Sequence, residues 1–105
     1  MLTHLNLFFK TLGDPNRLTI LALLLEHERC VCEITPVLGI SQPAVSQHLR
    51  RLAHLGLILE EKRAPWVYYR INKEHVLLKE VLHLIPASNI HSSQNPCSLE
   101  RSSHE

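Results

Sequence analysis

Two cysteines separated by one residue, Cys30 and Cys32, carry the clearest chemical signal in this 105-residue sequence. Thiolates are soft ligands that select soft ions such as trivalent arsenic or antimony, cadmium, lead, monovalent copper and zinc. Side chains two positions apart on a regular helix point in nearly opposite directions. The two sulfurs can therefore meet at one ion only where a helix begins, because the backbone before the first turn can bend both of them towards one point.

Pro36 indicates where that helix begins. A proline inside a helix leaves the carbonyl four residues earlier without its hydrogen-bond donor. We therefore expect a short helix over about residues 33–38 that begins near Cys32, with Pro36 in its first turn or just beyond it. A helix N-terminus also favours the thiolate, which is the form that binds metal. An ion held by both sulfurs would distort this helix start and shift the helix that follows.

Other interpretations of the cysteine pair stay open. The pair can be two small apolar residues of the core, or a redox pair, although a disulfide between residues two apart is strained. Two side chains could complete a metal site: Cys97, the only other cysteine, and His27, which is close to the pair in sequence. His75 and His83, eight residues apart, could instead form a metal site between the helices of a dimer.

The elements around the pair follow from hydrophobic periodicity and helix-capping residues. Apolar residues at i, i+3, i+4 and i+7 over residues 5–12 predict a first helix, which Gly13 ends. Asp14 and Pro15 are typical of the start of a second helix. Its predicted inward face is Leu18, Leu21, Ala22 and Leu25.

A helix-turn-helix is predicted over residues 34–55. Gly39 and Ile40 form a tight turn, Ser41 caps the second helix and Gly56 ends it. Glutamine can pair with adenine and arginine with guanine or a phosphate, and small residues let a helix approach the bases closely. The predicted DNA contacts on this helix are Ser41, Gln42, Ala44, Ser46, Gln47 and Arg50. The alternative is a plain surface helix.

The chain then changes to a strand pattern. Residues 57–59 and 66–71 are rich in β-branched, aromatic and aliphatic side chains, and the polar segment between them ends in a proline. We predict a two-stranded β-hairpin, with Lys62 and Arg63 near its tip in contact with the DNA backbone or the minor groove. The order helix, helix, helix-turn-helix, hairpin, helix predicts an α+β, mostly helical fold of the winged helix-turn-helix class.

The last part of the chain completes the predicted domain. Asn72 is expected to cap a final helix that Pro86 ends. Residues 1–86 would then form one DNA-binding and dimerisation domain, followed by a disordered tail over residues 87–105. The first and last helices have broader apolar faces than so small a domain needs, which predicts a homodimer joined through helices.

Charge and composition favour a DNA-binding protein over an enzyme. The net charge is +1, but residues 42–73 carry +4, so a polyanion would bind the middle of the chain. The longest apolar run, residues 20–25, is too short to span a membrane, and the N-terminus has no signal-peptide pattern, so we expect a cytoplasmic protein. No carboxylate or amide is placed to orient a cysteine–histidine nucleophile pair, so no enzymatic activity is predicted.

Four segments resemble the ArsR/SmtB family of metal-responsive bacterial repressors, and most closely its arsenical-resistance operon repressors. They are residues 7–18 (LFFKTLGDPNRL), 30–33 (CVCE), 41–49 (SQPAVSQHL) and 66–71 (WVYYRI). The resemblance implies a homodimer that represses its own resistance operon by binding double-stranded operator DNA. It also implies that As(III) or Sb(III) binds the Cys30 and Cys32 thiolates as inducer and releases the DNA, with no organic cofactor.

The sequence departs from this family at one ligand position. Many arsenic-responsive relatives carry a third cysteine three residues after the second, where this chain has Thr35. As(III) favours three sulfur ligands, so the third would come from Cys97, come from a cellular thiol, or be absent. Cadmium- and lead-responsive relatives add N-terminal cysteines, and zinc-responsive relatives use Asp and His of the last helix. A sensor of cadmium, lead or zinc, or of thiol oxidation, on the same fold is the alternative.

Overall fold

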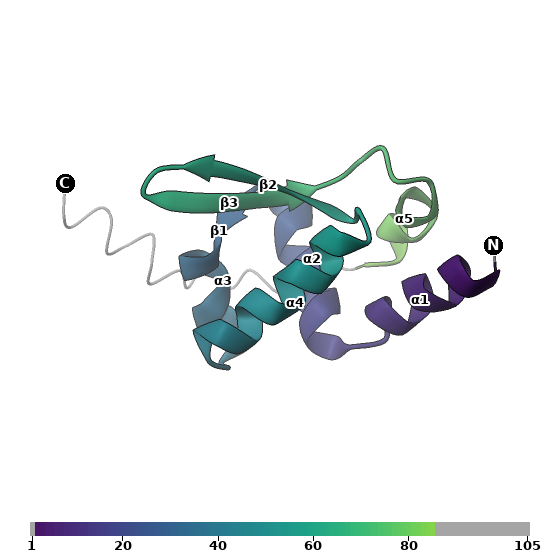
Figure 1. The fold of residues 1–105 in the computed structure, drawn as a ribbon, viewed down its shortest axis with the longest axis horizontal. Helices are drawn as coiled ribbons and strands as arrows, with labels where there is room; N and C mark the ends of the chain where they lie inside the picture. The colour runs from purple at the N-terminus through teal and green to yellow at the C-terminus, as the bar shows by residue number, and fades with distance from the viewer. Residues whose placement is uncertain (1, 86–105) are drawn as a thin grey trace.

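The protein, described by a computed structural model over residues 2–85, has a helical body and a long hairpin (Figure 1). In chain order its elements are α1 (Leu2–Leu12), α2 (Pro15–Glu26), β1 (Arg29–Cys30), α3 (Val31–Leu38), α4 (Gln42–His54), β2 (Ile58–Arg63), β3 (Trp66–Ile71), α5 (Val76–Val81) and the 3-10 helix η1 (Leu82–Leu84). The helix-turn-helix α3–α4 followed by the hairpin β2–β3 confirms the predicted winged helix-turn-helix fold. We call this hairpin the wing.

Helix α2 lies at the centre of the core. The Asp14 carboxylate caps it by accepting hydrogen bonds from the backbone N–H groups of Asn16 at 2.8 Å and Arg17 at 3.2 Å. Residues 20–24 are all buried, and the helix contacts α1, α3, α4 and β3. A helix that is apolar on all sides has no single inward stripe. The predicted inward face is therefore wrong in part, because Leu18 is 40% exposed.

The turn between α3 and α4 forms as predicted. Gly39 adopts the left-handed conformation, with φ of 69°, and its N–H donates to the Thr35 carbonyl to close α3. The Ser41 hydroxyl oxygen then caps α4 by accepting the Ala44 N–H at 3.3 Å. After α4, Gly56 again has a positive φ, 76°, which allows the chain to turn into the wing.

Helix α3 begins one residue before Cys32, near which it was predicted to begin. The helix begins at Val31, with Cys30 as its N-cap, so Pro36 is its sixth residue and lies beyond the first turn. The cause is a capping-box arrangement, in which the Glu33 carboxylate accepts the Cys30 N–H at 3.0 Å and fixes the first turn early. Pro36 therefore removes one internal hydrogen bond of a short helix without setting where the helix starts.

The sheet has one strand more than predicted. Its order is β1-β3-β2 and all pairs are antiparallel, with Cys30 opposite Tyr68 on β3. The wing itself is longer than the sequence indicated, because the polar residues 60–63 continue β2 until Arg63 pairs with Trp66. Charged residues form a strand here because most of β2 lies on the exposed wing rather than over the core.

The prediction that Asn72 caps the last helix is wrong. Its side chain accepts the Glu74 N–H at 3.1 Å and donates to the Gly56 carbonyl at 2.8 Å, so it stabilises the turn at the base of the wing. Helix α5 begins four residues later, where His75 Nδ1 accepts the Leu78 N–H. The tail predicted for residues 87–105, and the end of the last helix at Pro86, lie outside the described residues.

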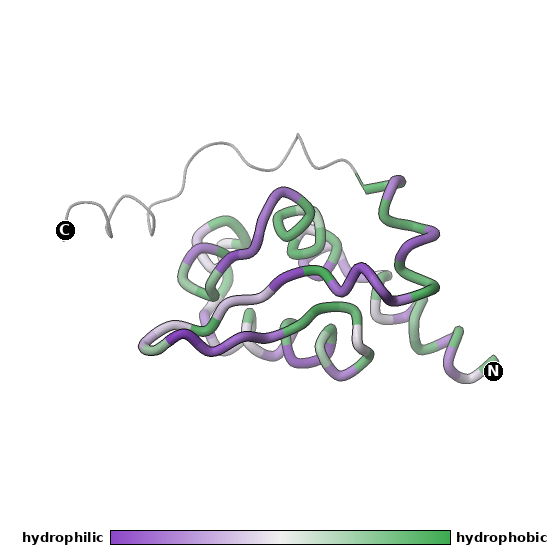
Figure 2. Tube along the Cα trace, turned by 90° about the horizontal axis from the view of Figure 1, so that it is seen from above, coloured by the Kyte–Doolittle hydropathy of each residue, from purple (hydrophilic) through white to green (hydrophobic). Residues whose placement is uncertain are grey.

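Helices α1 and α5 lie side by side on the flank of the molecule that faces away from the wing tip (Figure 1). Stacking of the His75 ring on Phe8, with centroids 5.8 Å apart, joins them. Hydrophobic and hydrophilic stretches alternate along both helices (Figure 2). An apolar groove of about 430 Å³ opens between α1, α2 and the C-terminal helical turns, and Phe9 and Leu84 on its rim are exposed. Within residues 2–85, no helix has the length and hydropathy needed to cross a bilayer.

Candidate nucleic-acid interface and cysteine pair

The cysteine pair lies at the junction of three elements. Cys30 is the second residue of β1 and the N-cap of α3, and Cys32 is the second residue of α3. A disulfide joins the two, with the Cα atoms 5.3 Å apart. Cys30 is fully buried and Cys32 is half-buried. Both sulfurs therefore meet at a helix start, as expected. The helix was predicted to begin near Cys32, whereas the observed helix begins at Val31 and has Cys30 as its N-cap.

Buried charged groups hold the pair in place. Arg29, only 6% exposed, donates to a Glu26 carboxylate oxygen at 2.6 Å, so its charge is compensated at the end of α2. Glu33 of α3, which is 5% exposed, accepts the Cys30 N–H with its carboxylate. The antiparallel pairing of β1 with β3 supplies a third attachment, to the wing. The segment that carries the sulfurs is thus fixed to α2, to α3 and to the wing at once.

The further ligands considered from the sequence do not gather around the pair in the described part of the chain. Within residues 2–85 no three histidine, cysteine or acidic side chains are grouped closely enough to hold a metal ion. His27 is exposed, and its ring Nδ1 donates to the Glu28 carbonyl at 2.8 Å. His75 is occupied as the cap of α5. Cys97 lies outside the described residues.

The predicted DNA contacts on α4 are all at least partly accessible to solvent. Ser41, Gln42, Gln47 and Arg50 are exposed, and Ala44 and Ser46 are half-buried at the N-terminal half of the helix. Val45, Leu49 and Leu52 on the opposite side are buried in the core. The helix thus presents polar and small residues to solvent, while its apolar face packs into the core and holds the helix in position.

Arg17 fixes the position of α4, and the sequence argument gave it no role in the site. Its Nε donates to the Thr11 carbonyl at 2.7 Å, and its Nη1 donates to His48 Nδ1 on α4 at 3.1 Å. The Asp14 carboxylate lies 3.9 Å from the same guanidinium. One side chain therefore connects the end of α1, the start of α2 and the middle of α4. The indication of this role in the sequence is that Arg17 is a cation three residues after the N-cap residue Asp14.

The two predicted DNA contacts of the wing, Lys62 and Arg63, differ in whether a carboxylate compensates their charge. Lys62 is exposed and has no carboxylate within ion-pair distance among residues 2–85. Arg63 forms a two-bond ion pair with Glu28, at 2.6 and 2.8 Å, and a further bond with Glu61 at 2.9 Å. Its hydrogen bonds to Glu28 and Glu61 hold the pKa of each carboxyl below the usual range. Arg63 therefore ties the wing to the loop before β1 and has its charge compensated there.

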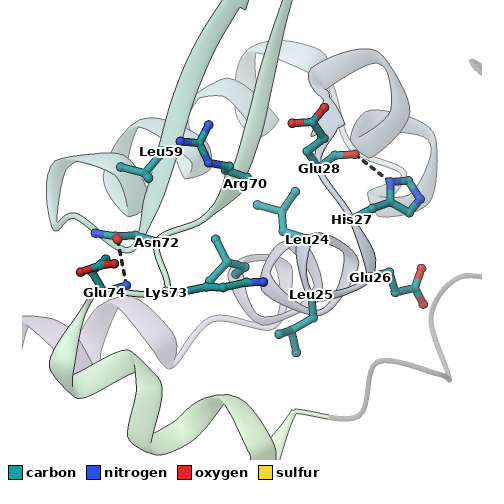
Figure 3. Close-up of a pocket in the computed structure, with 11 residues that line it drawn as sticks. Leu24, Leu25, Glu26, His27, Glu28, Leu59, Arg70, Asn72, Lys73 and Glu74 are labelled. Carbon is teal, nitrogen blue, oxygen red and sulfur yellow. Dashed lines mark hydrogen bonds between the residues drawn. The ribbon is translucent and has the colours of Figure 1, made fainter.

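A cavity of about 480 Å³ lies between the end of α2 and the base of the wing (Figure 3). Glu28, Arg70 and Lys73 project around it, and the ring of His27 is turned towards the Glu28 backbone (Figure 3). Charges of both signs line its wall, and neither cysteine does. The cavity is therefore separate from the sulfur site.

Comparison with known protein families identifies the same class of protein. Residues 14–59 match the family model described as "Bacterial regulatory protein, arsR family". The chain is 42% identical over 67 residues to the "Arsenic resistance transcriptional regulator ArsR1" of Pseudomonas putida, an alignment that covers 63% of this chain and 52% of that protein. It is 39% identical over 77 residues to the "Arsenical resistance operon repressor" of Bacillus subtilis, covering 70% and 73%. It is also 41% identical over 69 residues to a Staphylococcus aureus "Cadmium resistance transcriptional regulatory protein CadC homolog", covering 65% and 57%.

Solved structures agree with the sequence relatives. HlyU from Vibrio cholerae superposes with a TM-score of 0.69 at 33% identity, over 78% of this chain and 87% of that one. A homodimeric winged helix-turn-helix DNA-binding domain from Mycobacterium bovis superposes with a TM-score of 0.68 at 28% identity, over 80% and 76%. The chain spans only about half the length of some curated relatives, 52% for the Pseudomonas protein. The named relatives are described as regulators and not as enzymes, as the sequence predicts.

Proposed function

Since this chain belongs to the ArsR family of bacterial regulatory proteins, we propose that it is a transcriptional repressor that binds operator DNA as a homodimer in the cytoplasm. We further propose that As(III) or Sb(III), bound by the Cys30 and Cys32 thiolates, releases it from the DNA. The observation that carries this proposal is the meeting of the two sulfurs at the start of α3, the helix that packs against α4.

The DNA-binding part of the proposal rests on α4. Its exposed face carries residues that can hydrogen-bond base edges, such as Gln47 and Arg50, and the small side chains of Ala44 and Ser46 flank that face. Arg17 and the buried face hold the helix rigidly, which keeps its contacts in register. The exposed wing, with Lys62, would add contacts to the backbone.

The homodimer would use the flank formed by α1 and α5. The apolar groove there exposes Phe9, 56%, and Leu84, 71%, which a monomer would leave in water. A second copy placing its own α1 and α5 against this flank would bury both residues. The homodimeric domain from Mycobacterium bovis shares the fold and so supports a dimer. Two α4 helices related by a two-fold axis would then match a palindromic operator.

The donor set of the cysteine pair fits a soft ion. In the reduced protein the same two positions supply two thiolates side by side, which suits As(III), Sb(III) and other soft ions. A third sulfur would have to come from Cys97 or from a small cellular thiol, since no third cysteine lies within residues 2–85. The pair alone therefore defines two of the three ligands that As(III) favours.

The coupling to DNA would run through the attachments of Cys30. Because this residue is both the N-cap of α3 and part of β1, a change in its backbone alters the start of α3 and the pairing with β3 together. A ligand that binds only the form in which these contacts are altered lowers DNA affinity by its differential affinity for the two forms. Derepression follows.

The disulfide favours a second candidate, a repressor that responds to thiol oxidation. In this case two thiols would transfer two electrons and two protons to a disulfide such as oxidised glutathione, giving the Cys30–Cys32 bridge and two molecules of reduced glutathione. Cadmium, lead or zinc would be the alternative ions for the reduced pair, and cadmium is supported by the named cadmium regulator among the relatives.

A DNA-release experiment separates these candidates. The wild type, Cys32→Ser and Cys97→Ser are bound to operator DNA under anaerobic, reducing conditions, and micromolar arsenite is added. We expect release of the wild type but retention of Cys32→Ser, because the serine oxygen is a hard, poor ligand for As(III). Equal release of both would contradict the cysteine site. Release by oxidised glutathione but not by arsenite would favour the redox candidate, and X-ray absorption on the arsenite complexes of wild type and Cys97→Ser would count the sulfur neighbours.

A further inference from the structure

A second groove on the molecule is cationic, and of its lining residues the function proposed above uses only Gln47 and Arg50. It lies between α1 and α4, has a volume of about 470 Å³, and is lined by Leu7 and Thr11 from α1 and by Gln47, Arg50, Arg51 and His54 from α4, among others. We call it the α1–α4 groove. Its three cationic or ionisable groups all come from the C-terminal half of α4, whereas the predicted base contacts begin at the N-terminus of that helix.

The arginines of this groove differ from the other arginines of the described chain. Arg17, Arg29, Arg63 and Arg70 each have a carboxylate within ion-pair distance. Among residues 2–85, only Arg50 and Arg51 have none, and both are exposed. Two adjacent uncompensated guanidiniums, with an exposed histidine one turn later, create a local positive potential that attracts an oxyanion.

The length of α4 indicates which oxyanion would reach this groove. A helix of 13 residues is about 20 Å long, whereas the major groove of DNA is about 12 Å wide. When the N-terminal half of α4 contacts the bases and the helix crosses the groove at an angle, its last turns extend towards the sugar–phosphate backbone that borders the groove. The α1–α4 groove would then meet a phosphate.

We propose that the α1–α4 groove binds a phosphate of the DNA backbone beside the base-reading face, with Arg51 as its main ligand and Gln47, Arg50 and His54 as supporting donors. This inference rests on the proposed DNA-binding function. The same chemistry would accept a free phosphate ion, so the experiment must distinguish the two sources. Arg51 would therefore contribute to the affinity for DNA without contributing to sequence recognition.

The test uses the salt dependence of binding to random-sequence duplex DNA, because each phosphate contact changes the slope of log affinity against log salt by about 0.9. The full chain is measured as wild type, Arg51→Gln and Lys73→Gln by fluorescence anisotropy. Lys73 is an exposed cation at the base of the wing without an ion pair among residues 2–85, so its variant makes the same charge change elsewhere. Thermal unfolding confirms that both variants are folded.

For a dimer that loses two contacts, the affinity of Arg51→Gln should fall about tenfold less than that of wild type between 50 and 200 mM salt. The slope of Lys73→Gln should stay near that of wild type. Equal slopes for wild type and Arg51→Gln would overturn the inference while leaving DNA binding intact, and absence of any DNA binding by the wild type would instead overturn the proposed function.

Competition with inorganic phosphate distinguishes a phosphate of the DNA backbone from a free phosphate ion as the ligand of the groove. At equal ionic strength, phosphate and chloride should compete equally with DNA if the groove recognises the backbone in the context of the duplex. If phosphate displaces DNA from the wild type better than chloride, and not from Arg51→Gln, the groove is a site for the free ion and the assignment to the DNA backbone is wrong.

Discussion

Replacement of Asp14 tests how the start of α2 is stabilised. In Asp14→Ala, two backbone N–H groups lose their acceptor, and the Arg17 guanidinium loses a carboxylate 3.9 Å away. Loss of a helix N-cap costs about 1 kcal/mol, within a range of about 0.5–2 kcal/mol. For a domain of this size that corresponds to a fall in melting temperature of about 4–8 °C per kcal/mol. Asp14→Asn keeps an acceptor oxygen but not the charge, so we expect about half of this loss.

The pH dependence of the same variants separates the charge from the cap. Burial raises the pKa of the Asp14 carboxyl, but the N–H groups of Arg17 and Asn16, together with the nearby charges of Arg17 and His48, outweigh this and hold the pKa below the ordinary value of 3.8. The stabilisation by the charge is therefore complete above the pKa of the unfolded chain. It is lost as the pH falls through the lower pKa of the folded state.

Urea and thermal unfolding followed by circular dichroism measure these differences. Wild type, Asp14→Ala and Asp14→Asn are compared at one protein concentration, because dimerisation makes the melting temperature concentration-dependent. The advantage of wild type over Asp14→Asn should be full at pH 6 and shrink steadily below pH 4. A wild-type advantage that persists unchanged at pH 2, or an Asp14→Ala protein as stable as wild type, would refute the capping argument.

Two further predictions concern the wing and the helix-turn-helix. Glu28→Gln removes the two-bond partner of Arg63 and leaves only its bond to Glu61. Binding to random duplex DNA should therefore tighten and its salt slope should steepen, whereas Glu74→Gln, at an exposed acid near the base of the wing, should change the slope little. Identical slopes in all three proteins would mean that Arg63 does not reach DNA even without Glu28. Gly39→Ala places a Cβ where φ is 69° with nothing within 4 Å of it, so only backbone strain of about 1–2 kcal/mol should appear in urea unfolding, and Gly39→Asn should lose less; an unchanged Gly39→Ala protein would contradict that strain.

The parts of the fold that the sequence predicted are those specified by local chemistry. The caps Asp14 and Ser41, the glycine at the turn and the strand composition of the wing each act within a few residues, so they could be identified without long-range information. The resemblance of four segments to one family added the order of the elements. Secondary structure controlled by neighbours in sequence was therefore predictable in most of the described chain.

The parts that were missed depend on partners far away in sequence. Strand β1 has two residues and forms only because β3, some forty residues later, is placed beside it. The ion pair between Glu28 and Arg63 joins residues 35 apart, and no pattern near either residue indicates it. The uncompensated state of Arg51 is likewise known only once every nearby carboxylate is located. The position of the cysteine pair at the start of a helix was predicted, whereas its attachment to the wing through β1 was not.

The position of Cys30 leaves no spare residues between the sulfur site and the two elements that meet there. An insertion of one residue between β1 and α3 would separate the strand partner of Tyr68 from the helix cap, and a deletion would leave one of these roles unfilled. The segment at Cys30 can therefore vary by substitution at fixed positions but not in its length.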